Sequence, residues 1–172
     1  MDVAILGNAL KIRSKNASFV VNPVKAISKV NADAIFVLGN NLEIDTSRVL
    51  DHRIIINGPG EYEVGGVKIS VVLGAEGLAY NLFLDNTTVV LGKVSDISKL
   101  QENIPSCQIA LLEVDEDLKS IVAKLEPKIV ILYGDKKMDG LKLLGKEGIE
   151  PVQKFSTTKG KLPEEMEVVV LG

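Results

Sequence analysis

Short runs of β-branched and other apolar residues, separated by Gly, Asn and Pro, dominate the chain and predict strands joined by turns. In 67–71 (VKISV) every second residue is apolar, as in a strand with one face in water. The run 129–132 (IVIL) is apolar throughout, which predicts a strand covered on both faces. The expected strands are 2–6, 9–14, 17–21, 34–38, 53–57, 67–73, 79–84, 87–91, 108–113, 128–133 and 166–171.

Helical spacing of apolar residues between the later strands predicts helices there. In 116–125 apolar residues recur every three or four positions; Asp115 precedes the segment as an N-cap and Pro127 ends it. Ser95 can cap another helix in the same way. The expected helices are 23–30, 96–103, 116–125 and 137–147. Strands crowd the first half, and helices alternate with strands in the second. We therefore expect one α/β (α+β) domain over 1–172, with two mixed sheets flanked by helices.

Composition narrows the classes of partner. Hydrophobic residues make up 46% of the 172 positions, and 20 Lys+Arg against 23 Asp+Glu give a net charge of −3 without a basic stripe. This disfavours a nucleic-acid partner. No apolar run approaches the ~20 residues that span a bilayer, so we expect no membrane insertion. A single cysteine excludes an internal disulfide, and no charged-then-apolar leader opens the chain, so we expect a cytoplasmic protein.

Metal-binding side chains are scarce. The chain has one histidine, His52, and one cysteine, Cys107, whereas catalytic zinc usually takes two or three His or Cys ligands. His52 lies between charged neighbours and is expected at the surface, and Cys107 enters an apolar strand as a buried thiol. The acidic run 113–117 could hold a hard cation such as Mg²⁺, but its position before a helix favours capping.

Seven segments, taken in chain order, resemble one family. The most distinctive is 58–67 (GPGEYEVGGV), which by itself predicts a hairpin with its turn at the paired glycines. The others are 3–9 (VAILGNA), 20–23 (VVNP), 31–38 (NADAIFVL), 88–92 (TVVLG), 125–131 (LEPKIVI) and 162–169 (LPEEMEVV). Together they resemble the metallo-β-lactamase superfamily, in particular its compact Zn-dependent hydrolase-like branch. The resemblance implies a four-layer αββα sandwich whose site lies on one edge, between the two sheets.

The same resemblance shows that the family's metal motif is missing. Its His-x-His-x-Asp-His signature falls on 39–44 (GNNLEI), and the histidine of its Gly-His-Ala turn falls on Asn8. The bridging aspartate becomes Lys93, and the late histidine falls on or near Gly134. Glycine and isoleucine offer no side-chain ligand, and asparagine is a poor zinc donor beside imidazole. The Lys93 ammonium would repel a dication and could itself neutralise Glu43.

We therefore expect a non-catalytic member of the fold that acts as a binding or assembly module, without a cofactor, a catalytic residue or a metal ligand. Its vestigial cleft would take a small polar ligand or a protein partner, and the edge strand 168–171 could pair in a homo-oligomer. The alternative is a hydrolase with a rebuilt, non-zinc or hard-cation site using Glu43, Asp45, Glu61 or Asp135. The residues expected to line the cleft are Asn8, Gly39, Asn40, Asn41, Glu43, Glu61, Lys93 and Gly134.

Overall fold

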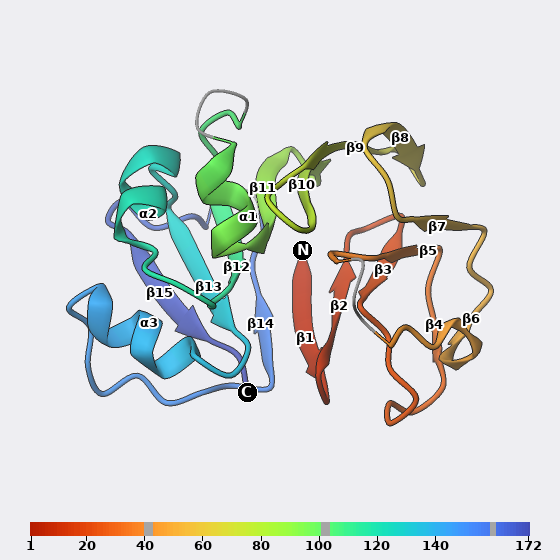
Figure 1. The fold of residues 1–172 in the computed structure, drawn as a ribbon, viewed down its shortest axis with the longest axis horizontal. Helices are drawn as coiled ribbons and strands as arrows, with labels where there is room; N and C mark the ends of the chain where they lie inside the picture. The colour runs from red at the N-terminus through yellow and green to blue at the C-terminus, as the bar shows by residue number, and fades with distance from the viewer. Residues whose placement is uncertain (40–42, 101–103, 159–160) are drawn as a thin grey trace.

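Two mixed β-sheets pack face to face in the computed structural model, which describes residues 1–39, 43–100, 104–158 and 161–172 (Figure 1). In the six-stranded sheet β14, β1, β2 and β3 alternate in direction, and β5 and β7 continue parallel to β3. Its order is β14 (Lys154–Ser156), β1 (Asp2–Leu6), β2 (Ala9–Arg13), β3 (Ser18–Val21), β5 (Ala34–Phe36) and β7 (Ile54–Ile56).

The seven-stranded sheet has a parallel half and an antiparallel half. β11, β12, β13 and β15 are parallel, and β10, β9 and β8 continue the sheet as an antiparallel meander. Its order is β15 (Glu167–Val170), β13 (Ile129–Tyr133), β12 (Ile109–Glu113), β11 (Thr87–Lys93), β10 (Leu78–Leu84), β9 (Val67–Leu73) and β8 (Gly60–Val64). The parallel half places the ends of β11, β12 and β13 side by side at one edge of the sheet.

The outer faces of the two sheets are covered differently. α1 (Val94–Lys99), α2 (Lys119–Leu125) and α3 (Lys137–Leu143) pack on the seven-stranded sheet, at the left of Figure 1. The outer face of the six-stranded sheet is covered instead by turns and short elements that contribute Ile27, Ala32 and Val49 to a small apolar cluster. These short elements are β4 (Val30–Asn31), the 3₁₀ turn η1 (Thr46–Arg48) and β6 (Val49–Leu50).

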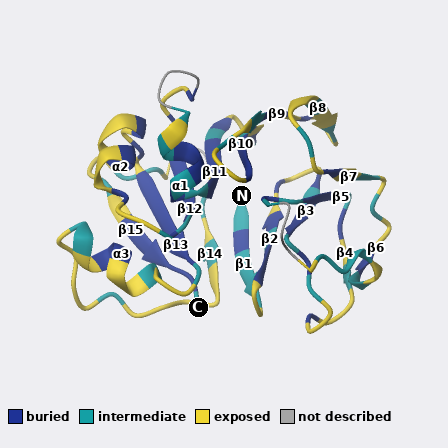
Figure 2. Ribbon diagram, viewed as in Figure 1, coloured by how far each residue is buried: buried dark blue, intermediate teal, exposed yellow. Residues whose placement is uncertain are grey.

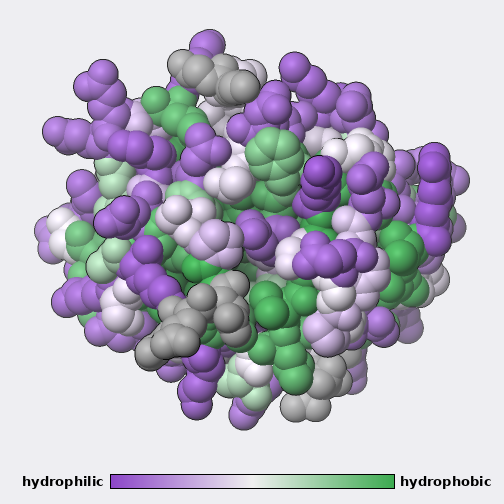
Figure 3. Space-filling model, turned by 90° about the horizontal axis from the view of Figure 1, so that it is seen from above, coloured by the Kyte–Doolittle hydropathy of each residue, from purple (hydrophilic) through white to green (hydrophobic). Residues whose placement is uncertain are grey.

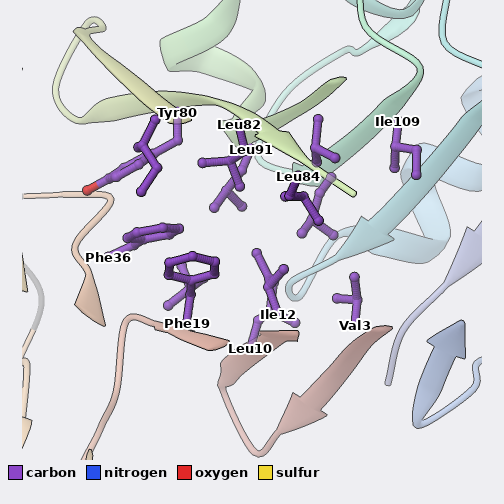
Figure 4. Packing of buried hydrophobic residues seen from close by; sticks show 14 of the residues in the cluster. Val3, Leu10, Ile12, Phe19, Phe36, Tyr80, Leu82, Leu84, Leu91 and Ile109 are labelled. Carbon is purple, nitrogen blue, oxygen red and sulfur yellow. The ribbon is translucent and has the colours of Figure 1, made fainter. Parts of the chain in front are cut away.

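The main core lies between the sheets, where the buried strand faces meet (Figure 2). Phe19 and Phe36 stack with ring centroids 4.7 Å apart, and Phe36 stacks on Tyr80 from the opposite sheet at 4.8 Å. Figure 4 shows this aromatic column beside the aliphatic side chains of both sheets. Burying apolar area of this kind stabilises the fold by roughly 25 cal/mol per Å².

The sandwich and the two mixed sheets expected from the sequence are confirmed, with most of their strands. β14 was not expected, and turns cover the outer face of the six-stranded sheet where helices were expected. The helix predicted over 23–30 is wrong. Pro23 suits a first helical turn, but only one turn forms, closed by the Ile27 N–H donating to the Val24 carbonyl at 3.2 Å. β-branched and serine residues follow, which favour extended or turn conformations over helix, and Ile27 is buried against the sheet instead.

The exposed surface carries isolated apolar side chains. Figure 3 shows apolar side chains between polar and charged ones on the face seen from above. The large exposed apolar residues come from different elements or loops: Leu50, Ile55, Leu73, Phe83, Met138 and Val152. Within the described part of the chain, no helix is long and apolar enough to cross a membrane.

Candidate functional site

Three parallel strands end side by side with polar residues. Lys93, Glu113 and Tyr133 are the last residues of β11, β12 and β13, and they are paired in register across the sheet. Side chains two positions apart on a strand point to the same face. The residues two positions before this row all belong to the core between the sheets: Leu91, Leu111 and Ile131. The row Lys93–Glu113–Tyr133 therefore closes the core at the carboxyl edge of the parallel strands.

A cavity of about 510 Å³ lies against this row. Glu113 and Tyr133 form its wall on the seven-stranded sheet, and the β1–β2 turn with Gly7 and Asn8 faces them from the other sheet. The remaining polar lining includes Asn22, Asp135 and Lys137. Ligands of open α/β sheets bind at the carboxyl ends of parallel strands, and this cavity has that position. Another hollow of about 500 Å³ between α2 and α3 is lined mostly by apolar and lysine side chains, away from the strand ends.

Tyr133 is the most unusual group in the cavity wall. Its side chain is 4% exposed, and its hydroxyl has no hydrogen-bond partner among the described residues. Burial raises the pKa of the Tyr133 phenol well above its ordinary value, and the nearby Glu113 carboxylate raises it further. The hydroxyl is therefore neutral, and its donor and acceptor stay unused among the described residues.

Glu113 occupies a carboxylate-rich position beside Tyr133. Burial is the main cause that raises the pKa of Glu113, and the nearby carboxylates Asp115, Asp135 and Asp96 add to the rise. Lys93, its neighbour across the strand pair, acts in the opposite direction. The expectation that Lys93 neutralises Glu43 is not supported, because the charge beside Lys93 is Glu113 and Glu43 is exposed on a loop.

The cleft predicted from the sequence is found only in part. Asn8 and Gly134 line the cavity, and Lys93 lies in the row beside Glu113. Glu61 is instead on the edge strand β8, where it accepts a hydrogen bond from the Ser70 hydroxyl at 2.6 Å. Gly39 forms a bridge to Gly77 between the sheets. The structure does not bring these two residues into the cavity lining, and Asn40 and Asn41 lie outside the described residues.

Sequence reasoning missed Tyr133 and Lys137, and gave Glu113 only as part of an acidic run. A signal for the row existed, since each of its members follows or ends a predicted apolar strand. The register that places three strand ends side by side comes only from the parallel pairing of β11, β12 and β13. Lys137 begins α3, the helix that follows this edge of the sheet.

Two carboxylates of the acidic run bond to helix starts, as the sequence indicated, but Asp115 does so on another helix than expected. The Asp115 carboxylate accepts the backbone N–H and the hydroxyl of Ser95, at the start of α1, twenty residues earlier. Asp117 accepts the N–H of Lys119, the first residue of α2, at 2.9 Å. Ser95 therefore receives a cap instead of providing one. These bonds fix α1 and α2 beside the strand ends.

Tyr80 lies on β10, at the other end of this edge of the seven-stranded sheet, and connects the two sheets there. Its hydroxyl lies 2.7 Å from the Ile56 carbonyl oxygen and 2.9 Å from that of Val37, to which it donates, and it accepts the Val37 N–H at 3.1 Å. Beside it the buried carboxylate of Asp96 accepts the N–H groups of Glu76 and Gly77 at 2.9 and 2.8 Å. The two sheets are thus joined by hydrogen bonds here, whereas the Tyr133 end is open to a cavity.

The residues of the cavity do not fit a zinc centre. Among the described residues, no group of three or more His, Cys, Asp or Glu side chains could hold a metal ion. Gly134 has φ +89°, which strains any side chain, and a Cβ there would lie 3.1 Å from Glu113 Cγ. His52 is outside the cavity lining, with its Nδ1 2.7 Å from the Val49 carbonyl oxygen. The backbone at Gly134 is therefore adapted to glycine, at the position where the resemblance described above would place a histidine.

Comparison with known proteins identifies the fold of this chain. No family model matches the chain, and no curated protein matches it. A Thermotoga maritima protein described as a Zn-dependent hydrolase of the metallo-β-lactamase superfamily is 22% identical, with a TM-score of 0.74 over 99% of this chain and 97% of its own. A Parabacteroides distasonis protein described as a metal-dependent hydrolase is 15% identical, with a TM-score of 0.68 over 98% and 91%.

A more distant similarity extends to a Veillonella parvula protein described as a possible metal-dependent hydrolase, 12% identical with a TM-score of 0.52 over 84% and 91% of the two chains. These similarities confirm the fold that the sequence segments indicated: the chain has the metallo-β-lactamase fold. The neighbours carry hydrolase descriptions, and this chain shares their architecture without a group of metal-binding side chains among its described residues.

Proposed function

We propose that this protein is a non-catalytic, metal-free binding module on the metallo-β-lactamase fold, and that it holds a small polar ligand in the cavity between the sheets. The observation that carries the proposal is the cavity of about 510 Å³ at the carboxyl ends of the parallel strands, which Asn8, Asp135 and Lys137 line with polar side chains.

The side chains of the row support binding over metal-dependent hydrolysis. Hydrolysis on this fold needs a metal-bound hydroxide, which needs ligands to hold the metal. The row supplies Lys93, Glu113 and Tyr133, of which only Glu113 is a good ligand for a cation. The ammonium of Lys93 near Glu113 disfavours a dication at this position.

The alternative is a hydrolase with a rebuilt hard-cation site. Of the four carboxylates considered for it, only Asp135 lines the cavity, where it joins Glu113. Asp45 accepts hydrogen bonds from the N–H and hydroxyl of Ser47 instead, and Glu61 is bound to Ser70. The alternative therefore reduces to a cation held by Glu113 and Asp135.

One experiment separates the two functions. The protein is purified after growth with added Zn²⁺, Mn²⁺ and Mg²⁺, its metal content is measured by mass spectrometry, and hydrolysis of p-nitrophenyl acetate and bis(p-nitrophenyl) phosphate is assayed. We expect substoichiometric metal and no turnover above the rate in buffer. Stoichiometric metal together with turnover, both lost in Asp135→Asn and kept in the control Asp139→Asn on the exposed side of α3, would contradict the proposal and establish the alternative.

Self-association and compartment remain part of the proposal. The edge strand β15 is partly covered, because the Val152 N–H donates to the Val170 carbonyl at 2.8 Å and the Gly172 N–H donates to the Val152 carbonyl at 3.2 Å. Pairing of two chains along β15 would use the remaining part of this edge, and light scattering measures it directly. A cytoplasmic location agrees with the free, buried thiol of Cys107, whose burial raises its pKa to about 12.

A further inference from the structure

We propose that Asn57 is a site of spontaneous deamidation, at which the folded protein converts an asparagine into aspartate and isoaspartate. Asn57 and Gly58 lie in the connection between β7 and β8, where the segment 58–67 singled out in the sequence begins. They form the one Asn-Gly pair of the sequence. The site is separate from the cavity, whose lining includes neither residue.

The reaction begins at the backbone nitrogen of Gly58, which attacks Cγ of the Asn57 amide. A C–N bond forms between these two atoms, the Cγ–Nδ2 bond breaks, and Nδ2 leaves as ammonia with the proton of the Gly58 N–H. Water then opens the five-membered imide. Cleavage between the ring nitrogen and Cγ gives aspartate, and cleavage between the ring nitrogen and the backbone carbonyl carbon gives isoaspartate. The net change replaces NH₂ by OH, and no oxidant or reductant takes part.

The surroundings of Gly58 leave this attack unhindered. Asn57 is exposed, and apart from the chain neighbours no heavy atom lies within 4 Å of a Cβ built at Gly58. Glycine itself places no side chain beside the attacking nitrogen. Within the described part of the chain no backbone carbonyl accepts the Gly58 N–H. The Tyr62 hydroxyl donates to the Gly58 carbonyl at 3.1 Å, which holds the far side of the residue and does not engage its nitrogen.

The Asp-Gly pair at Asp139 shows how the fold protects a similar sequence. Aspartate before glycine can form the same imide, with loss of water in place of ammonia. Gly140, however, lies inside α3, and its N–H donates to the Lys136 carbonyl at 3.0 Å. A Cβ at Gly140 would lie 3.0 Å from side-chain carbons of Val114, so the position is also enclosed. The helix therefore withholds the nitrogen that the connection at Gly58 leaves available.

Asn16 provides the second comparison, because it is exposed like Asn57. The residue that follows it is Ala17, whose side chain stands beside the nitrogen that would attack. The Ala17 N–H also donates to the Ser14 hydroxyl at 3.0 Å. Exposure of the asparagine is thus common to both sites, and the unbound glycine nitrogen distinguishes Asn57.

The modification would change the connection between the two sheets. β7 ends at Ile56 on the six-stranded sheet, and β8 begins at Gly60 on the seven-stranded sheet, so residues 57–59 join them. Isoaspartate lengthens the backbone by one methylene group, and either product makes the net charge of −3 more negative. Deamidation therefore alters both the length and the charge of the chain where it crosses between the sheets.

The test incubates the full chain in mildly alkaline buffer at physiological temperature and follows its tryptic peptides by mass spectrometry. Deamidation is detected as the mass difference between NH₂ and OH, and a protein isoaspartyl methyltransferase labels the isoaspartyl product. Asn57→Gln lengthens the side chain, so that only a slower six-membered ring could form. Gly58→Ala adds a side chain beside the attacking nitrogen, and Asn16→Gln is the matched control. Circular dichroism confirms that each variant is folded.

We expect the mass gain and the methyl label in the peptide that contains Asn57. The gain should be lost in Asn57→Gln, slowed several-fold in Gly58→Ala and unchanged in Asn16→Gln. An Asn57 peptide that gains mass no faster than the Asn16 peptide would overturn the proposal. A gain that appears only when the protein is unfolded in urea would also overturn it, because the fold would then protect Asn57 as it protects Asp139.

Discussion

Two buried tyrosines mark the two ends of one edge of the sandwich, and their hydroxyls meet different surroundings. Tyr80 reaches across to the other sheet and bonds to backbone groups of Val37 and Ile56. Tyr133 ends a strand of the same sheet, is equally buried, and finds no partner among the described residues. One phenol joins the two sheets, whereas the hydroxyl of the other stays inside the protein, in a residue that lines a cavity.

The two tyrosines therefore represent two kinds of buried polar group, one with its hydrogen bonds satisfied and one without. A buried polar group that contributes to stability has its hydrogen bonds satisfied, as at Tyr80. A buried polar group without a partner lowers stability, which is the interpretation we give to Tyr133. The predictions below change each end in turn and compare the free energy of unfolding.

The largest effect is expected at the closed end, for Gly77→Ala. A Cβ at Gly77 would lie 2.2 Å from the Leu38 carbonyl oxygen and 2.5 Å from Asp96 Oδ2, both held by hydrogen bonds nearby. We expect a loss of about 3 kcal/mol in urea denaturation. Gly58→Ala is the control, since no atom lies within 4 Å of a Cβ there. Equal stability of the two variants would show that the closed end tolerates movement.

A smaller loss is expected for Tyr80→Phe. The substitution removes the hydroxyl that bonds to the Val37 carbonyl in the core, whereas the Val37 N–H and the Ile56 carbonyl keep their bond to each other at 3.0 Å. We expect about 2 kcal/mol lower stability, measured by the same denaturation. Tyr62→Phe, which removes one hydrogen bond at a half-buried site, should lose less than half of that. A Tyr80→Phe variant as stable as the wild type would mean that this hydroxyl does not join the sheets.

The smallest effect is expected for Glu113→Gln and depends on pH. Burial holds the pKa of Glu113 above its ordinary value of 4.5, so the folded state binds this proton more tightly than the unfolded state does. The wild type therefore loses stability as pH rises from 4.5 through the raised pKa. Glutamine removes this penalty, so the variant should be more stable at neutral pH, with a gain that disappears below pH 4.5.

The matched control for the pH dependence of Glu113→Gln is Glu164→Gln, at an exposed position just before β15. Its stability difference from the wild type should not change between acidic and neutral pH. A gain for Glu113→Gln that is the same at all pH values would instead indicate better packing of the amide. That result would remove Glu113 ionisation from the account of the cavity.

Much of the fold could be predicted from the sequence because strand signals are local. Alternation in 67–71 and the continuous apolar run 129–132 correspond to β9 and β13. Elements with weak signals were missed or misassigned: β14 is three residues with an exposed lysine and serine, and 23–30 has a helical start without a helical continuation. Their conformations are set by tertiary contacts, which a single sequence does not show.

The site was predictable only where the family resemblance supplied positions. Asn8 and Gly134 were found in this way and line the cavity. The row of Lys93, Glu113 and Tyr133 depends on the register of three parallel strands, and parallel strands are separated by helices in the chain. No local pattern encodes that register, so the unpaired hydroxyl of Tyr133 could be found only in the folded structure.

The most direct test of the account is the free energy of unfolding of Tyr133→Phe in buffer without added ligand. If the hydroxyl is buried without a partner, its removal should raise stability by about 1 kcal/mol, opposite in sign to the effect of Tyr80→Phe. A loss of stability comparable to that of Tyr80→Phe would show that Tyr133 already has a partner within the folded chain, and it would contradict the central claim.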